Sequence, residues 1–379
     1  MNALNKKITF DEIMEFYPKH NRSVYEDLKA EYQKGCLLPF VGAGLSVFCW
    51  YKSWPDVLKE LNEFVFSAEK RTQIEEMIAE DKLLQAAQMI CDNYPLMLKE
   101  LSKIVGYEKI KNCEKKALTT SAVYVLPYLF NDNLLMTTNF DRVLEEVYEQ
   151  HQTKFGKVVN PFEPDILTQI RQKNSHCLFK LHGDIGPDTH DIEKLVFTQE
   201  QYDKAYATDS ALVQELSQWF QNKRLLFLGC SLAMDKTMEV LQAAIQKNVA
   251  LSHYAILACK PEDMESRIGE MGELGISAIY YPDGKHEAVR VLLERLLEET
   301  NNKAYEELSK YTISVKTSNA EHRFMYNSGY FTFVGRKDEL NRLNEFCQND
   351  EQLSWWAITG PGGMGKSRLV PLVTIFWQS

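Results

Sequence analysis

The sequence predicts an α/β protein with a Rossmann-like, mostly parallel sheet that carries helices on both faces. Short, nearly continuous apolar segments of strand length alternate with helical patterns between residues 37 and 299. Strands of this kind are buried on both faces, which is typical of parallel sheets. Four of these segments end in glycine or small polar residues, as strands do at the ligand-binding edge of an open sheet. A Gly-rich motif near residue 360 predicts the start of a second, P-loop domain.

Composition argues against several classes of protein. A chain of 379 residues can hold two or three domains, and 45% hydrophobic with 25% charged residues is ordinary for a globular protein. The formal net charge of −10 disfavours a general nucleic-acid or anionic-membrane binder. No apolar run reaches membrane-spanning length, and the N-terminus lacks the apolar core of a secretory signal. We therefore expect a cytoplasmic protein with no membrane partner and no nucleic-acid partner for this part of the chain.

The first expected strand, residues 37–41, follows one or two helices within residues 1–34 and runs into a Gly-rich turn. The residues of this turn are Gly42, Ala43, Gly44, Leu45 and Ser46. Glycine in such a turn lets backbone N–H groups approach a phosphate. The dinucleotide fingerprint has a third glycine where this chain has Val47. Taken alone, the turn is therefore equally typical of a plain tight connection between a strand and a helix.

Between residues 54 and 129, apolar residues recur three and four positions apart, and no strand pattern interrupts them. This predicts a helical insertion over about residues 54–130, between the first and second strands. Helical patterns, one of them over 140–150, separate the later strands, and a helix over 287–299 closes the domain. These later strands are expected at residues 134–138, 177–181, 225–230, 254–258 and 276–280, with a minor extended piece at 195–197.

The eight cysteines are scattered, and none forms a C-x-x-C pair. A structural zinc site is therefore not expected, and no metal ligand set is predicted for the first domain. Most of the cysteines stand in apolar segments, which predicts buried thiols in a reducing compartment.

A second unit is expected to begin at residue 331, after a polar linker over residues 301–330. An apolar strand pattern leads into a G-x-x-x-x-G-K-S motif that contains Gly360, Gly362, Gly363, Gly365, Lys366 and Ser367. In a P-loop, backbone N–H groups cradle the phosphates of ATP, the lysine reaches the terminal phosphates and the serine holds Mg²⁺. Only twelve residues follow Ser367, too few for such a domain. We therefore expect residues 331–379 to be the first part of an incomplete ATPase domain in a longer protein.

Polar or small residues follow four of the predicted strands. Because parallel strands place their carboxyl ends at one edge of the sheet, these residues are expected to line a common cleft. Together they predict a nucleotide site at that edge. The four groups are Gly42 to Ser46, Thr137 to Asp141, Leu181 to Asp184, and Gly229 to Ser231.

The order and spacing of GAG-x-S, TTN-F-D, LHGD and GCS over about residues 35–300 resemble those of a sirtuin-fold domain. They look more similar still to the sirtuin-like NAD-hydrolysing effector domains of bacterial antiphage proteins. The resemblance implies an NAD⁺-binding domain over residues 1–300, in which Asn139 and His182 act at the nicotinamide ribose. Asp141 and Asp235 suit helix caps equally well. By the resemblance, NAD⁺ contacts Gly42, Ala43, Gly44, Ser46, Thr138, Asp141, Gly229, Ser231 and Asp235.

These residue types suit cleavage of the bond between nicotinamide and ribose, which passes through an oxocarbenium-like state. The Asn139 amide can orient the ribose or a water molecule, and a neutral His182 can accept a proton near neutral pH. Protein-deacylating sirtuins carry a zinc module with C-x-x-C pairs and a Gly-Ile-Pro-Asp-Phe-Arg loop. This chain lacks the first and has Tyr-Lys-Ser-Trp-Pro-Asp at residues 51–56 in place of the second. Water is therefore the expected acceptor, and ADP-ribose and nicotinamide are the expected products.

With Phe333 to Arg336 upstream, the P-loop resembles the start of a STAND-class signalling ATPase. This resemblance implies antiviral defence by abortive infection, in which the missing C-terminal region senses a phage-derived trigger and cellular NAD⁺ is lost. It also implies homo-oligomerisation on activation. Two alternatives stay open: a non-catalytic module that binds NAD or ADP-ribose and controls oligomerisation, and a sirtuin-type deacylase or ADP-ribosyltransferase.

Overall fold

The chain divides into two compact units, Met1–Ser309 and Lys310–Ser379. The first unit holds an α/β domain built on a seven-stranded sheet, and the second lies almost entirely outside the described residues. The P-loop motif and Phe333 to Arg336 therefore lie outside the described residues too. The computed structural model describes residues 7–49, 51–94, 96–106, 110–163, 176–185, 194–232, 236–247 and 252–317.

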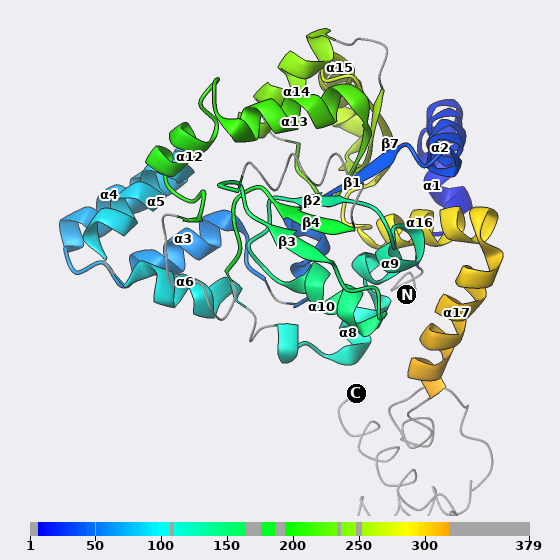
Figure 1. The fold of residues 1–379 in the computed structure, drawn as a ribbon, viewed down its shortest axis with the longest axis horizontal. Helices are drawn as coiled ribbons and strands as arrows, with labels where there is room; N and C mark the ends of the chain where they lie inside the picture. The colour runs from blue at the N-terminus through cyan, green and yellow to red at the C-terminus, as the bar shows by residue number, and fades with distance from the viewer. Residues whose placement is uncertain are drawn as a thin grey trace, which may run out of the picture. The chain divides into compact units, whose positions relative to one another are not determined.

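All seven strands of the sheet run parallel, in the order β3-β4-β2-β1-β5-β6-β7 (Figure 1). The first strand along the chain is central, β2 to β4 add on one side of it, and β5 to β7 add on the other. Val41 pairs with Thr137 on one side and with Leu228 on the other, so three carboxyl ends meet where the strand order reverses. The strands are β1 Leu37–Val41, β2 Leu135–Thr137, β3 Lys157–Val159, β4 Cys177–Lys180, β5 Arg224–Leu228, β6 His253–Cys259 and β7 Ile276–Pro282.

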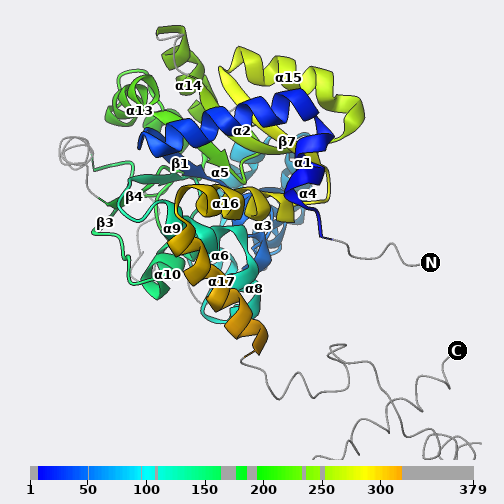
Figure 2. The same ribbon diagram turned by 90° about the vertical axis from the view of Figure 1, so that its right-hand side faces the viewer.

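Helices cover both faces of the sheet, as the sequence predicts. Outside the insertion they are α1 Phe10–Phe16, α2 Pro18–Gln33, α10 Val143–Gln150, α12 Gln199–Ala205, α13 Ala211–Asn222, α14 Lys236–Lys247, the 3-10 turn η5 Pro261–Asp263, α15 Met264–Glu273, α16 Glu287–Thr300 and α17 Asn302–Thr317. Figures 1 and 2 show α13 and α14 on one side of the sheet and α10 and α16 on the other. Alternate residues of β1 enter the two clusters: Leu37 and Val41 pack with α2, α10 and α16, and Leu38 and Phe40 pack with α13 to α15.

A helical insertion separates β1 from β2, as predicted. After two 3-10 turns, η1 Ala43–Leu45 and η2 Val47–Cys49, it consists of α3 Trp54–Asn62, α4 Ala68–Ala79, α5 Leu83–Asn93, α6 Met97–Val105, α8 Lys115–Thr120, η3 Ala122–Val125 and α9 Leu126–Leu129. Helices α3 to α6 build an apolar cluster of their own, which also takes in Ile185, Leu195 and Phe197. In Figure 1 these four helices lie to the left of the sheet, far from α1, α2 and α16.

Two details of the predicted elements are wrong. Strand β3 at the sheet edge has only three residues with one of them buried, so it leaves no apolar pattern to find. Residues 195–197, expected as a minor extended piece, are not part of the sheet, and Leu195 and Phe197 pack into the insertion cluster. The helix expected from residue 140 begins at Val143, whose N–H donates to the Asp141 carboxylate at 3.0 Å.

Cysteine burial is mixed among the described residues. Cys49, Cys177 and Cys259 are buried, and Cys36, Cys91, Cys113 and Cys230 are half-buried. The prediction that most thiols are buried is therefore only partly right. None of the described helices combines the length and the apolar character needed to cross a bilayer.

Candidate active site

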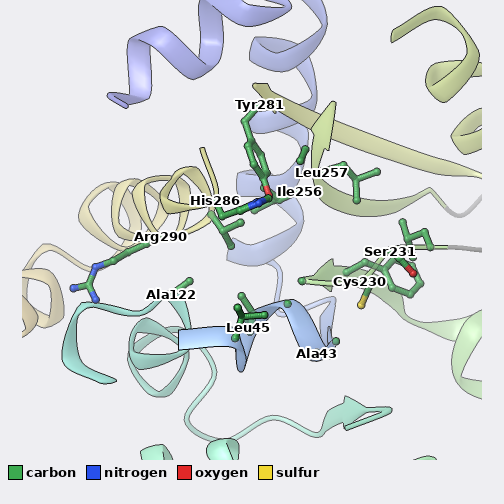
Figure 3. A pocket seen from close by; sticks show the side chains of 18 of the residues that line it. Ala43, Leu45, Ala122, Cys230, Ser231, Ile256, Leu257, Tyr281, His286 and Arg290 are labelled. Carbon is green, nitrogen blue, oxygen red and sulfur yellow. The ribbon is translucent and has the colours of Figure 1, made fainter. Parts of the chain in front are cut away.

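A cavity of about 800 Å³ lies at the carboxyl ends of β1, β5 and β6, where the strand order reverses. This volume falls within the roughly 300–1,000 Å³ typical of small-molecule sites. Figure 3 shows Ala43 and Leu45 on one side of the cavity, with Ile256 and Tyr281 on the opposite side. The sheet topology therefore places the cavity at the kind of position where parallel α/β sheets bind ligands.

The glycine turn after β1 packs directly on the turn after β5. The Gly44 N–H donates to the Gly229 carbonyl oxygen at 2.9 Å, and Gly229 has a φ of +66°. A Cβ atom added at Gly42 would lie 2.5 Å from that oxygen, and one at Gly44 would lie 2.8 Å from it. This close packing by itself requires glycine at both positions, and it also brings the backbone of residues 42–44 to the cavity wall.

The far wall contains functional candidates that lie outside the four predicted strand-end groups. Tyr281 at the end of β7 contacts His286 through its hydroxyl, 3.2 Å from Nδ1. Arg267 of α15 donates to the Ser231 carbonyl oxygen at 2.6 Å, and Arg290 of α16 donates to the Ser121 carbonyl oxygen at 2.8 Å. Both arginines thus brace segments of the wall. They sit in ordinary amphipathic helices, so their spacing carries no signal of a ligand site.

A hydrogen-bonded chain joins the turn after β1 to the loop after β2. The Asn139 amide Nδ2 donates to the Ser46 hydroxyl at 3.3 Å, and Ser46 in turn hydrogen-bonds to the Asp141 carboxylate. All three side chains are buried. Burial raises the pKa of Asp141, although the Val143 N–H and the Lys180 ammonium oppose the shift. Ser46 therefore holds Asn139 and Asp141 in fixed positions relative to the glycine turn.

His182 closely follows β4 and contacts two tyrosines, Tyr202 in α12 and Tyr206 directly after that helix. Its Nε2 lies 3.1 Å from the Tyr202 hydroxyl and 3.4 Å from the Tyr206 hydroxyl. Burial lowers the pKa of His182 to about 4, and a hydrogen bond to the Thr138 backbone only partly offsets this. The ring is therefore neutral at physiological pH. A neutral imidazole can serve as a proton acceptor.

A buried lysine ties together the two loops that carry Asn139 and His182. Lys180 is wholly buried, and its Nζ lies 2.7 Å from the Asp184 carboxylate and 2.9 Å from the Glu145 carboxylate. It also donates to the Asp141 carbonyl oxygen at 2.6 Å. These contacts raise the pKa of Lys180 against the opposing effect of burial, so the ammonium form is retained. The Asp184 of the LHGD motif thus pairs with this internal cation.

The predicted site residues fall into two neighbouring groups. Those that line the cavity are Gly42, Ala43, Gly44, Thr138, Gly229 and Ser231. Those that do not line it are Ser46, Asn139, Asp141 and His182. Thr138 connects the groups, because it reaches the cavity, precedes Asn139 and hydrogen-bonds through its backbone to His182. Asp235 lies outside the described residues.

Metal ligands are not gathered in the part of the chain that the structure describes. No three His, Cys, Asp or Glu side chains among those residues are grouped so as to hold an ion. The side chains gathered at this edge of the sheet include the imidazoles of His182 and His286, the Asn139 amide, the Asp141 carboxylate and the guanidinium groups of Arg267 and Arg290.

Residues 133–279 match the family model of the SIR2-like domain. The chain is also similar to the NAD(+) hydrolase ThsA of Enterococcus faecium, with 26% identity over 244 residues, 59% of this chain and 44% of the relative. It is 24% identical to the NAD(+) hydrolase ThsA of Acinetobacter baumannii (strain 532279) over 219 residues, which are 56% of this chain and 40% of that relative. It is 24% identical to the NAD(+) hydrolase ThsA of Bacillus cereus (strain MSX-D12) over 234 residues, which are 60% of this chain and 44% of that relative. This chain thus spans less than half the length of these relatives, and the part from the approach to β2 into β7 has the sequence pattern of a SIR2-like domain.

Proposed function

We propose that this chain carries an NAD⁺ glycohydrolase effector, which converts NAD⁺ and water to ADP-ribose, nicotinamide and a proton. The observation that carries the proposal is the position of the cavity. It is walled by two Gly-rich turns, and at Thr138 it adjoins the loops that hold Asn139 and His182. The names of the similar proteins, NAD(+) hydrolases, agree with this reading.

In this proposal the two Gly-rich turns hold the pyrophosphate and adenosine half of NAD⁺. The nicotinamide ribose then extends past Thr138 toward Asn139 and His182. The bond from nicotinamide nitrogen to the anomeric carbon breaks, nicotinamide leaves neutral, and a water oxygen bonds to that carbon. Asn139 orients the ribose or the water, and neutral His182 accepts the proton. The Tyr202 hydroxyl lies 3.1 Å from the acceptor nitrogen Nε2 of His182. The substrate hydroxyl or the water therefore either displaces the tyrosine hydroxyl from this nitrogen or passes its proton to His182 through that hydroxyl.

The test uses the intact protein, activated with ATP, Mg²⁺ and lysate from phage-infected cells. We expect NAD⁺ consumption, and a loss of at least 100-fold in Asn139→Ala and His182→Ala. Asn222→Ala, an exposed asparagine at the end of α13, is the matched control and should retain full activity. Urea unfolding of each variant separates lost chemistry from lost folding. Undiminished hydrolysis in both site variants would refute these roles.

Two other functions predict different outcomes in the same assay. A module that binds NAD or ADP-ribose without turnover gives binding by calorimetry and no nicotinamide, even in the activated protein. A deacylase or ADP-ribosyltransferase gives acyl-ADP-ribose or labelled protein as its main product. The lack of C-x-x-C zinc ligands in the sequence favours hydrolysis over deacylation.

We further propose that residues 331–379 begin a STAND-type ATPase that controls the effector during antiviral defence. In this scheme ATP and Mg²⁺ bind the P-loop through Lys366 and Ser367, a phage-derived trigger is sensed elsewhere, and activation proceeds by homo-oligomerisation. The G-x-x-x-x-G-K-S motif supports this part of the proposal. Lys366→Ala should abolish trigger-dependent NAD⁺ loss in cells, whereas Lys310→Ala, a lysine before the motif, should not.

A further inference from the structure

Two thiols meet at the two ends of the α3–α6 segment of the insertion, one before α3 and the other after α6. Cys49 ends the η2 turn, and Cys113 lies between α6 and α8. Their Sγ atoms are 2.8 Å apart, although 64 positions separate them in the sequence. A disulfide bond is about 2.05 Å long, so the sulfur atoms need to approach by less than about 1 Å to bond.

The two segments that carry these thiols are held side by side by a second contact. The Tyr51 hydroxyl donates to the Gly106 carbonyl oxygen at 3.3 Å. Tyr51 follows Cys49 closely, and Gly106 precedes Cys113 on the returning segment. The thiols therefore face each other across a junction that also contains this hydrogen bond.

The two thiols differ in their exposure to solvent and in their expected reactivity. Cys49 has 1% of its surface exposed, whereas Cys113 is half-buried. Burial and the neighbouring thiol raise the pKa of Cys49, so it is the less reactive thiol toward an external oxidant. Cys113 is thus the sulfur that an oxidant meets first, and Cys49 is placed to resolve the product.

We propose that Cys49 and Cys113 form an oxidisable dithiol site whose co-substrate is a hydroperoxide, and that oxidation links the two ends of the α3–α6 segment covalently. The Cys113 thiolate attacks the O–O bond, which gives a sulfenic acid and one molecule of water or alcohol. The Cys49 sulfur then displaces the hydroxyl of the sulfenic acid, which leaves as water. With hydrogen peroxide, two thiols and one peroxide become one disulfide and two molecules of water.

The bond encloses residues 50–112, which contain the whole of α3 to α6. These helices pack around an apolar cluster of their own, which also contains Ile185, Leu195 and Phe197. The bond also joins two segments that wall the cavity: Val47 and Phe48 precede Cys49, and Thr120 and Ser121 follow α8. Oxidation thus fixes one wall of the cavity and prevents the two ends of the α3–α6 segment from separating. This proposal does not depend on the proposed function.

The test uses the full chain, reduced with dithiothreitol, freed of the reductant and treated with hydrogen peroxide while folded. After alkylation and digestion without reductant, mass spectrometry should find one cross-linked peptide pair containing Cys49 and Cys113. The melting temperature should rise by on the order of 5 °C and return on reduction, because the cross-link restricts the unfolded chain. Neither measurement requires NAD⁺ hydrolysis.

Cys113→Ser should eliminate both the cross-link and the rise in melting temperature, and it is chosen because its side chain is half-buried. Cys91→Ser removes another half-buried thiol of the insertion and should leave both results unchanged. Sulfinic or sulfonic acid at Cys113 without a linked peptide would overturn the proposal. A link between other cysteines in the folded protein, or an unchanged melting temperature in the linked protein, would overturn it as well.

Discussion

The Lys180 ammonium and the Asp184 carboxylate form an ion pair of 2.7 Å inside the domain, with the lysine wholly buried. Lys180 is the last residue of β4, and Asp184 belongs to the loop that follows this strand. The same ammonium binds the carbonyl oxygen of Asp141 in the loop after β2. One internal charge thus fixes two loops of the candidate active site at once.

Replacing this cation should destabilise the domain. Lys180→Met removes the buried partner of the Asp184 and Glu145 carboxylates, although Arg142 still pairs with both, so we expect a loss of about 3 kcal/mol in the free energy of unfolding. Urea unfolding measures it. Lys154→Met removes a lysine from an exposed pair with Glu149 and should change stability little. Equal effects of the two substitutions would contradict the role assigned to Lys180.

A methyl group on the glycine turn should disrupt both the turn and the cavity. Gly44→Ala places a Cβ 2.8 Å from the Gly229 carbonyl oxygen, so we expect a loss of about 1–3 kcal/mol and weakened nucleotide binding. Gly269→Ala on α15 meets no atom within 4 Å and should stabilise the helix by about 0.5–1 kcal/mol. Chemical denaturation and calorimetry with ADP-ribose check both variants. If Gly44→Ala binds ADP-ribose as tightly as the unmodified protein, the turn is not part of the site.

The pH dependence of the proposed hydrolysis should be shifted toward acid. Burial lowers the pKa of His182 to about 4, so the ring stays neutral and able to accept a proton down to about pH 5. In the activated protein, kcat/KM should therefore be flat from pH 8 to about 5.5 and fall below that range. An acid limb centred near pH 6.5, the ordinary pKa of histidine, would show that another group acts as the base.

Buried histidines should make the fold sensitive to acid. Burial lowers the pKa of His151, His182 and His253 to about 4 in the folded chain. In the unfolded chain these histidines bind protons near pH 6.5. Their contribution to the free energy of unfolding is therefore fully present above pH 6.5 and is lost as the pH falls from 6.5 to 4. Each histidine contributes up to about 1.4 kcal/mol per pH unit over that window.

His151→Phe isolates one of these contributions. The ring packs between Tyr124 and Tyr128, and its Nε2 has no hydrogen-bond partner. Phenylalanine keeps the aromatic packing and cannot be protonated. We expect the free energy of unfolding at pH 7 to stay the same or to rise by about 1 kcal/mol. Between pH 6.5 and 4, the decrease of this free energy with falling pH should become smaller by about 1.4 kcal/mol per pH unit. Urea midpoints at pH 7, 6 and 5 measure this, and an unchanged slope means that His151 is accessible to protons in the folded state.

The sheet was predictable because its strands are short, apolar and followed by polar ends. Parallel strands buried on both faces leave that pattern in the sequence, as in Leu37–Val41 and Arg224–Leu228. Strand β3 was not predictable, because an edge strand with one buried residue resembles a loop. The strand order was also beyond the sequence, since it depends on pairings between segments far apart in the chain.

The candidate site was predictable in its turns but not in its far wall. The glycines at 42, 44 and 229 follow apolar strands directly, and this local pattern marks the turns, although the contacts that require glycine are between the two turns. Arg267 and Arg290 reach the cavity only because α15 and α16 fold back over β6 and β7, and no local motif records that. The tyrosine hydroxyls at His182 are a similar case, because α12 brings them from twenty and twenty-four residues away.

The position of β1 at the centre of the sheet has a consequence for synthesis of the chain. Its partner β5 begins at Arg224, so at about 5–20 residues per second the ribosome delivers that partner on the order of 10–40 s after β1 emerges. During this interval a fully apolar strand has no neighbour on one edge. Folding of this domain should therefore be slow and dominated by non-local pairing, and a nascent chain interrupted before residue 228 should be prone to aggregate.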